Sequence, residues 1–136
     1  MKTELTIEES TKLIGLGVDK KLASIKGFVP IHPEVLKGNA EYAKPWGWMP
    51  KFTLTDLLAI LPKEIDSNIL VINSTGFNKE TEKLEEGWSV FYVNYKYDVA
   101  FGEESIFSAP ELIDALYQLL CWVIENRYIN LDNENQ

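Results

Sequence analysis

The chain has 136 residues, a net charge of −8 and a single cysteine, which is the size of one domain and leaves no internal disulfide. Its only arginine is Arg127, and arginine is the usual reader of phosphates and base edges, so we expect no direct binding to nucleic acid. The first residues lack the apolar run of a secretion signal, and no apolar stretch reaches the roughly 20 residues of a membrane span, so we expect a cytoplasmic protein without a membrane role.

The negative charge is concentrated in the last part of the chain. Residues 98–136 hold one arginine against eight Asp or Glu, a net charge of −7, whereas residues 1–62 hold eight lysines against seven acids. A surface of one sign favours a partner of the opposite sign and association that depends on salt. The candidate acidic surface comprises Glu103, Glu104, Glu111, Asp114 and Glu125.

The first predicted element is a short helix. Thr6 and Glu9 have the spacing of a capping box, in which each side chain satisfies a backbone N–H of the first turn. Gly15 and Gly17 then end the helix.

Residues 20–51 are predicted to be mostly irregular. Seven glycines and prolines punctuate this stretch, which argues against any long regular element, although residues 33–42 could form one short helix. Thr53 then caps a second helix, which Pro62 ends. Its leucines recur at helical spacing, at Leu54, Leu57, Leu58 and Leu61.

Two apolar runs are predicted to be strands. Residues 69–72 are rich in β-branched side chains and bounded by polar residues, which favours a strand covered on both faces. Residues 88–101 alternate, with Phe91 and Val93 on an apolar face and Asn94 on a wet face. This run exceeds a typical strand, so it is either one long bent strand or two strands that separate near Asn94. The link over residues 76–87 is expected to be a solvated, charged loop.

The last predicted element is a long helix. Ser108 and Glu111 have the spacing of a capping box around Pro110, and the residues that follow carry almost no charge. At 100° per residue, the large apolar side chains fall in an arc of roughly 140°. They are Leu112, Ile113, Leu116, Leu119, Leu120, Val123 and Ile124. A helix this apolar should be covered on most sides, as the central post of a core or as the contact for a second chain.

Together these elements predict the α+β class, with a small antiparallel sheet of about three strands packed against the long C-terminal helix and two shorter helices. Residues 1–130 are expected to form a single domain. Residues 131–136 are expected to be a disordered tail.

Few side chains suggest chemistry. His32 is the only histidine, and no cluster of His and Cys accompanies it, so we interpret it as a surface loop residue. Cys121 lies within the apolar helix, where a thiol acts as a small hydrophobe. Glu103 and Glu104 are adjacent, which does not fix the separation that glycoside chemistry needs. We therefore predict no catalytic, cofactor-binding or metal-binding residue.

The aromatic segment over residues 44–52 is the one feature that is unusual for a pure scaffold. Large aromatic side chains in irregular segments often anchor partners. The alternative is that they fold over the end of the core as a plug, because exposed tryptophans lower solubility. The candidate partner surface comprises Trp46, Trp48, Met49 and Phe52.

A set of landmarks along the chain supports a resemblance. They are Thr6–Glu9, Leu16, Gly17, Leu57, Leu58, Leu61, Pro62, Ile65, Trp88, Tyr92, Leu112–Leu116, Trp122 and Ile124–Asn126. In these positions the chain resembles a group of short uncharacterised proteins of prophages and integrated mobile elements in gut bacteria of the Bacteroidetes type. Since the landmarks are largely core and cap positions, the resemblance implies a fold and an accessory role inside a bacterial cell, and it implies no catalytic residue.

We therefore expect a non-enzymatic interaction protein without a cofactor, which binds a protein partner or a second copy of itself. Two alternatives stay open. One is an acidic, DNA-mimicking inhibitor of a host defence protein, and the other is a small enzyme without a recognisable motif.

Overall fold

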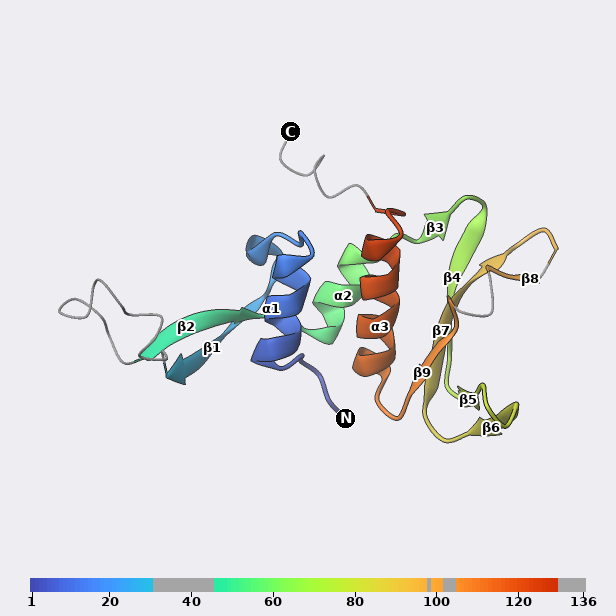
Figure 1. Ribbon diagram of the computed structural model, residues 1–136, viewed down its shortest axis with the longest axis horizontal. Coiled ribbons are helices and arrows are strands. Elements are labelled where there is room, and N and C mark those ends of the chain that lie inside the picture. Colours follow the sequence, from blue (N-terminus) through green and yellow to red (C-terminus); the bar gives the residue numbers. More distant parts are fainter. Residues whose placement is uncertain (31–45, 98, 102–104, 130–136) are drawn as a thin grey trace.

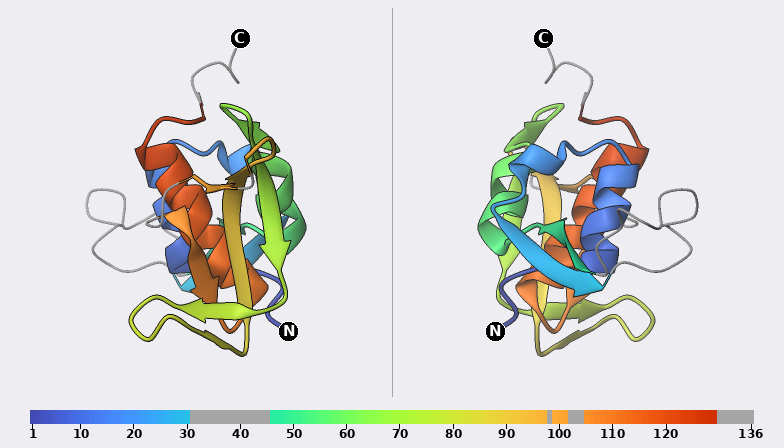
Figure 2. Two further views of the ribbon diagram at one scale, coloured as in Figure 1. Left: turned by 90° about the vertical axis from the view of Figure 1, so that its right-hand side faces the viewer. Right: turned by 90° about the vertical axis from the view of Figure 1, so that its left-hand side faces the viewer.

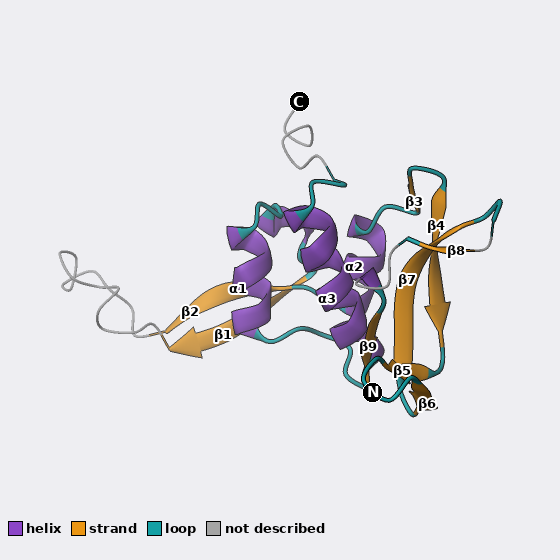
Figure 3. Ribbon diagram, turned by 45° about the vertical axis from the view of Figure 1, so that its right-hand side comes forward, coloured by secondary structure: helices purple, strands orange, loops and turns teal. Residues whose placement is uncertain are grey.

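Helices on one side and a sheet on the other are the two layers of the fold (Figures 1 and 3). The computed structural model describes residues 1–30, 46–97, 99–101 and 105–129. Within this part of the chain, three α-helices lie on one side of a five-stranded antiparallel sheet. Of two further strand pairs, one lies beside the sheet and the other lies on the helical side, away from the sheet (Figure 1). The α+β class is confirmed, whereas the prediction of about three strands is wrong.

The sheet is organised around β7 (Trp88–Asn94). Strand β4 (Asn68–Asn73) pairs with β7 over six residues, and β3 (Glu64–Ile65) pairs with the start of β4. On its other side β7 pairs first with β9 (Phe107–Ala109) and then with β8 (Val99–Ala100). Within this sheet, the strands that the sequence does not reveal are β3 and β9, which have only two and three residues and are too short to display an alternating pattern.

The two short helices form as predicted. Helix α1 (Ile7–Gly15) begins at Thr6, whose hydroxyl accepts from the backbone N–H of Glu9 at 3.1 Å, while the Glu9 carboxylate accepts from the Thr6 N–H at 3.0 Å. Helix α2 (Leu54–Ile60) has the same capping box, formed by Thr53 and Asp56. A 3₁₀ turn, η1 (Lys20–Leu22), follows α1.

Helix α3 (Leu112–Glu125) begins three residues later than the predicted capping box requires. Ser108 does not cap it, because Ser108 lies in β9, where its hydroxyl donates to Ser89 Oγ at 3.2 Å. Pairing with β7 keeps the backbone up to Ala109 extended, and the following Pro110 also disfavours a helical Ala109. Glu111 is the N-cap residue, and its side chain makes no capping hydrogen bond.

The predicted apolar arc of α3 faces the core. Leu116, Leu119, Leu120 and Val123 are fully buried, and the helix packs against β7 and β9 on one side and α2 on the other. The N-terminal segment, α1, α2 with the residues before it, and β7 each contribute one or a few buried side chains to the same core. These side chains, each at most 1% exposed, include Leu5, Leu13, Phe52, Leu57, Val90 and Tyr92.

The sheet faces differ from the prediction. Val90 and Tyr92 of β7 are buried, so the inner face is the one predicted to be wet. Phe91 and Val93 lie half-buried on the outer face, which Figure 2 shows with α3 behind it. The strand over residues 69–72 is confirmed, but it is not covered on both faces, since Ile69 is 41% exposed. Of the two alternatives for residues 88–101, separation into two strands near Asn94 is the correct one.

Two segments predicted to be irregular contain strands. Strand β1 (Ile25–Pro30) pairs antiparallel with β2 (Trp46–Lys51), although both include glycine and proline. A separate two-stranded ribbon has two edges, where a proline removes no central ladder hydrogen bond. Strands β5 (Gly76–Asn78) and β6 (Lys83–Glu85) form a second short pair within the predicted charged loop.

Two predictions fall outside the described residues. These are the short helix over residues 33–42 and the tail over residues 131–136. In the part of the chain that is described, no helix has both the length and the apolar character needed to cross a membrane.

The buried arc of α3 gives a first test. Leu116 is fully buried at the middle of the helix, so Leu116→Ala should lower the free energy of unfolding by about 2–5 kcal/mol through a cavity. Asp114 lies in a partly exposed ion pair with Lys2, so Asp114→Ala should cost no more than about 1 kcal/mol. Urea denaturation of both variants checks this, and similar losses would contradict the assigned orientation of the helix.

The approach of β7 to β9 gives a second test. Gly87 has φ +125°, and a Cβ there would lie 2.5 Å from the backbone oxygen of Ala109. Gly87→Ala should therefore cost at least about 1–3 kcal/mol in thermal denaturation. Gly15 is the matched control, because a Cβ there meets nothing within 4 Å and the helical position favours alanine. A Gly15→Ala variant as unstable as Gly87→Ala would contradict this assignment.

Candidate functional site

The β1–β2 hairpin projects from the helical side of the molecule, away from the sheet (Figure 1). One of its faces rests on α1 at Gly27, where a Cβ would lie 2.6 Å from Ile7 Cδ1 and 2.7 Å from Lys51 Cδ. The absence of a side chain at Gly27 lets the helix approach this closely. An ion pair of 2.6 Å between Lys51 Nζ and Glu4 Oε1 holds the same end of the hairpin.

A second attachment fixes the entry to β1. The Asp56 carboxylate accepts from the backbone N–H of Ser24 at 2.8 Å and also from the Ser24 hydroxyl, in addition to capping α2. Burial alone would raise the pKa of Asp56, but the hydrogen bonds from Ser24 and Thr53 outweigh it and hold this pKa below its usual value. The charged carboxylate therefore ties η1 and β1 to the N-terminus of α2.

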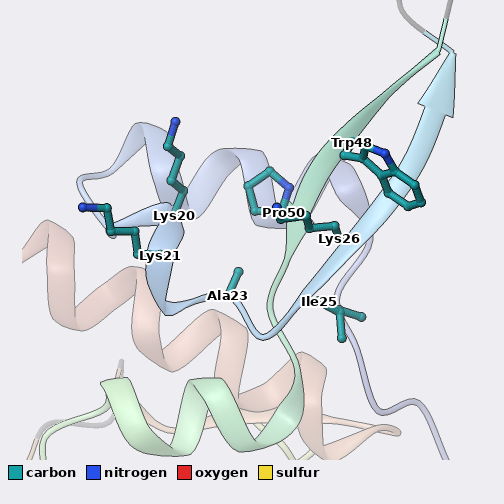
Figure 4. Close-up of a pocket in the computed structure, with 7 residues that line it drawn as sticks. All are labelled: Lys20, Lys21, Ala23, Ile25, Lys26, Trp48 and Pro50. Atoms are coloured by element: carbon teal, nitrogen blue, oxygen red, sulfur yellow. The ribbon is translucent and has the colours of Figure 1, made fainter.

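The outer face of the hairpin and η1 enclose a pocket of about 310 Å³, which we call the hairpin groove (Figure 4). Lys26 and Pro50 are partners across the hairpin, and Trp48 follows two residues from Pro50 on the same strand. Alternation along a strand places Trp48 and Pro50 on one face. The described residues that line the groove are Lys20, Lys21, Ala23, Ile25, Lys26, Trp48 and Pro50.

The hairpin groove combines an apolar floor with a positive rim. Ala23, Ile25 and Pro50 are half-buried, and Trp48 is 64% exposed. Lys20, Lys21 and Lys26 are exposed, and none of the ion pairs among the described residues involves them. In a chain of net charge −8, the groove is therefore a local surface that is both positive and apolar, which suits a ligand that is both negative and apolar.

The predicted partner surface is divided by the structure. Trp48 is exposed at the groove and Met49 is half-buried on the same strand. Phe52, in contrast, is 0% exposed and belongs to the core, where its backbone N–H donates to Ser10 Oγ at 3.1 Å. The backbone of Trp46 pairs with Pro30 in the hairpin, and its side chain lies outside the description.

The sequence pattern does not predict the three lysines of the groove as part of a site. Lys20 and Lys21 are adjacent and follow the end of the first predicted helix, so an adjacent basic pair was the available signal. Lys26 gives no comparable signal, because only the hairpin register brings it beside Pro50, 24 positions later.

The predicted acidic surface is partly neutralised. Lys2 Nζ lies 2.7 Å from Asp114 Oδ1 and 3.1 Å from Glu9 Oε1, and the Lys2 backbone N–H donates to Glu111 Oε2 at 3.0 Å. Burial would lower the pKa of Lys2, but the hydrogen bonds to Asp114 and Glu9 outweigh it and raise this pKa above its usual value. Glu125 is exposed at the end of α3, whereas Glu103 and Glu104 lie outside the described residues.

The remaining candidate groups have structural surroundings. Cys121 is buried in α3, and burial raises the pKa of its thiol, which disfavours the reactive thiolate. His32 lies outside the described residues. Among those that are described, no three His, Cys, Asp or Glu side chains gather closely enough to hold a metal ion.

Two other surfaces differ from the hairpin groove. A pocket of about 220 Å³ is lined by Phe77, Lys79, Glu82 and Ile106, and it carries charges of both signs. Tyr97 and Val99 are more than half exposed beyond the end of β7. Neither surface joins an aromatic side chain to several charges of one sign, as the hairpin groove does.

The divided aromatic segment gives a third test. Phe52→Ala should cost about 3–5 kcal/mol of stability, because a large side chain is removed from a closed core. Trp48→Ala should cost less than about 1 kcal/mol, because most of its side chain already contacts solvent. Thermal denaturation of the two variants decides, and a greater loss for Trp48→Ala would mean that Trp48 also closes the core.

No protein-family model matches this chain, and no significant match was found among the curated proteins or the solved structures. The resemblance to proteins of mobile elements therefore stays a prediction.

Proposed function

We propose that this protein is a non-enzymatic interaction protein that binds a protein partner through the hairpin groove. The observation that carries the proposal is the exposure of Trp48 beside three lysines, on a hairpin whose base is attached to the rest of the fold.

An exposed tryptophan at a concave site has the properties of a binding anchor. Tryptophan is among the residues whose truncation most weakens protein interfaces, because it buries a large area with few rotatable bonds. The aliphatic stems of Lys20 and Lys26 add further apolar surface while their ammonium groups stay in water. A partner that covers Trp48 would therefore gain apolar contact and electrostatic attraction together.

The buried polar groups support a non-catalytic role. Asp56 is occupied by Ser24 and Thr53, the Ser10 hydroxyl accepts from the Phe52 N–H, and the Asn68 amide donates to the Ile65 carbonyl at 2.9 Å. Each of these bonds holds a backbone segment in place. A general base or nucleophile needs a side chain that is free to meet a substrate, and these side chains are used for the fold.

The position of Lys2 weighs against the DNA-mimic alternative. A mimic of nucleic acid needs a continuous array of carboxylates, whereas Lys2 lies between Glu9 and Asp114 and also bonds Glu111.

We propose that the protein acts in the cytoplasm of a bacterial cell, as an accessory protein of a mobile element. This part of the proposal is supported by the resemblance alone.

The fourth test compares partner capture by three forms of the tagged protein in its native cell. Wild type should capture the partner, and Trp48→Ala should lose it, because Trp48 is the proposed anchor. Tyr97→Ala is the control and should retain the partner, because Tyr97 is similarly exposed, at 67%, but lies outside the groove. Mass spectrometry identifies the partner, and titration calorimetry with the purified partner then measures direct binding.

Two results would contradict the proposal. One is retention of the partner by Trp48→Ala with unchanged affinity. The other is a turnover, found in a substrate screen, that a groove substitution abolishes.

A further inference from the structure

We propose that the segment occupying the hairpin groove is a short acidic peptide stretch of the partner, with carboxylates beside the lysines and an apolar side chain against Trp48 and Pro50. This inference rests on the function proposed above and specifies the chemistry of the partner. The charge, the shape and the size of the groove support it.

The charge of the groove is positive and local. Lys20, Lys21 and Lys26 contribute three ammonium groups, and Asp19, whose carboxylate accepts from the Lys21 backbone N–H at 2.9 Å, contributes one negative charge, so residues 19–26 keep a net charge of +2. Each lysine is exposed and absent from the ion pairs of the described residues. An exposed ammonium attracts a nearby carboxylate, and salt screens this attraction. Several such contacts therefore favour an anionic ligand.

The shape of the groove requires an apolar component as well. Trp48 and Pro50 lie on β2, Ile25 is the first residue of β1, and Ala23 lies in the link between η1 and β1 (Figure 4). A free inorganic anion would leave this apolar floor in contact with water. A peptide that alternates acidic and apolar side chains satisfies both parts of the groove.

The size of the groove limits the contact to a short segment. A volume of about 310 Å³ lies at the lower end of the range for small-ligand sites. It accommodates a few side chains. The remaining contact area of a stable complex would then come from the surfaces around the hairpin.

Nucleic acid fits the same groove less well. Phosphate backbones continue beyond a short groove, and a chain of net charge −8 repels the parts of a polyanion that extend past the lysines. Among the described lining residues, Trp48 is the only aromatic platform and there is no arginine.

The fifth test measures the fluorescence anisotropy of a labelled peptide that repeats Glu-Glu-Leu, titrated with the full chain. A peptide with Gln in place of Glu and a labelled oligothymidylate are the comparison probes. The acidic peptide should bind most tightly, and added salt should weaken it. Binding should fall at least about tenfold in the triple variant Lys20→Gln, Lys21→Gln, Lys26→Gln.

A matched triple variant controls for the change in net charge. Lys63, Lys83 and Lys96 are exposed and lie outside the groove, so Lys63→Gln, Lys83→Gln and Lys96→Gln together should leave binding of the acidic peptide within about twofold of wild type. The NMR signal of the Trp48 indole N–H gives a second readout. Only the acidic peptide should shift it, in wild type and in the control triple variant alike.

The failures of the two proposals can be told apart. Equal binding of the Glu and Gln peptides, an equal loss in both triple variants, or no binding of the acidic peptide would overturn the acidic specificity. Tighter binding of the oligothymidylate than of the acidic peptide would show that the groove prefers nucleic acid, which would also overturn the proposal. In each case the partner capture by Trp48→Ala and Tyr97→Ala still decides whether the groove binds a protein at all.

Discussion

The apolar surface of α3 is the constraint on which the rest of the structure depends. Apolar side chains occupy most of the circumference of this helix, so packing against a single neighbouring layer would leave some of them in contact with water. The sheet covers one side through β7 and β9, and α2 covers another. The N-terminal segment closes the fold through Leu5 and Leu13, and Lys2 reaches the first turn of α3. The two-layer arrangement in Figure 3 follows from this requirement.

Local interactions were predictable, and contacts set by distant residues were not. The capping boxes at Thr6 and Thr53 each depend on a residue three positions away, so the sequence displays them in full. Ser108 has the same local pattern, but pairing of β9 with β7 overrides it. The faces of β7 were assigned wrongly because its outer face also carries apolar side chains, and only the position of α3 selects Val90 and Tyr92 as the inner pair.

The candidate site shows the same division. The aromatic segment was visible in the sequence, because tryptophans near prolines are unusual, and Trp48 is exposed. Phe52, four residues away, is buried, and that difference follows from where β2 ends and α2 begins. The positive rim could not be predicted as a unit. Lys26 joins Lys20 and Lys21 only through the register of the hairpin and the attachment of Ser24 to Asp56.

The attachment of the hairpin couples recognition to local stability. A two-stranded ribbon is at best marginally stable by itself in water, so β1 and β2 depend on Ile7, on Asp56 and on the Lys51–Glu4 pair. Among the described residues these contacts involve few side chains, so we expect the hairpin to detach from α1 at a lower free energy than the unfolding of the whole chain. If a partner binds only the attached form, its apparent affinity is lowered by the fraction of molecules in which the hairpin is detached. Residues that never touch the partner, such as Glu4 and Ile7, thereby contribute to its affinity.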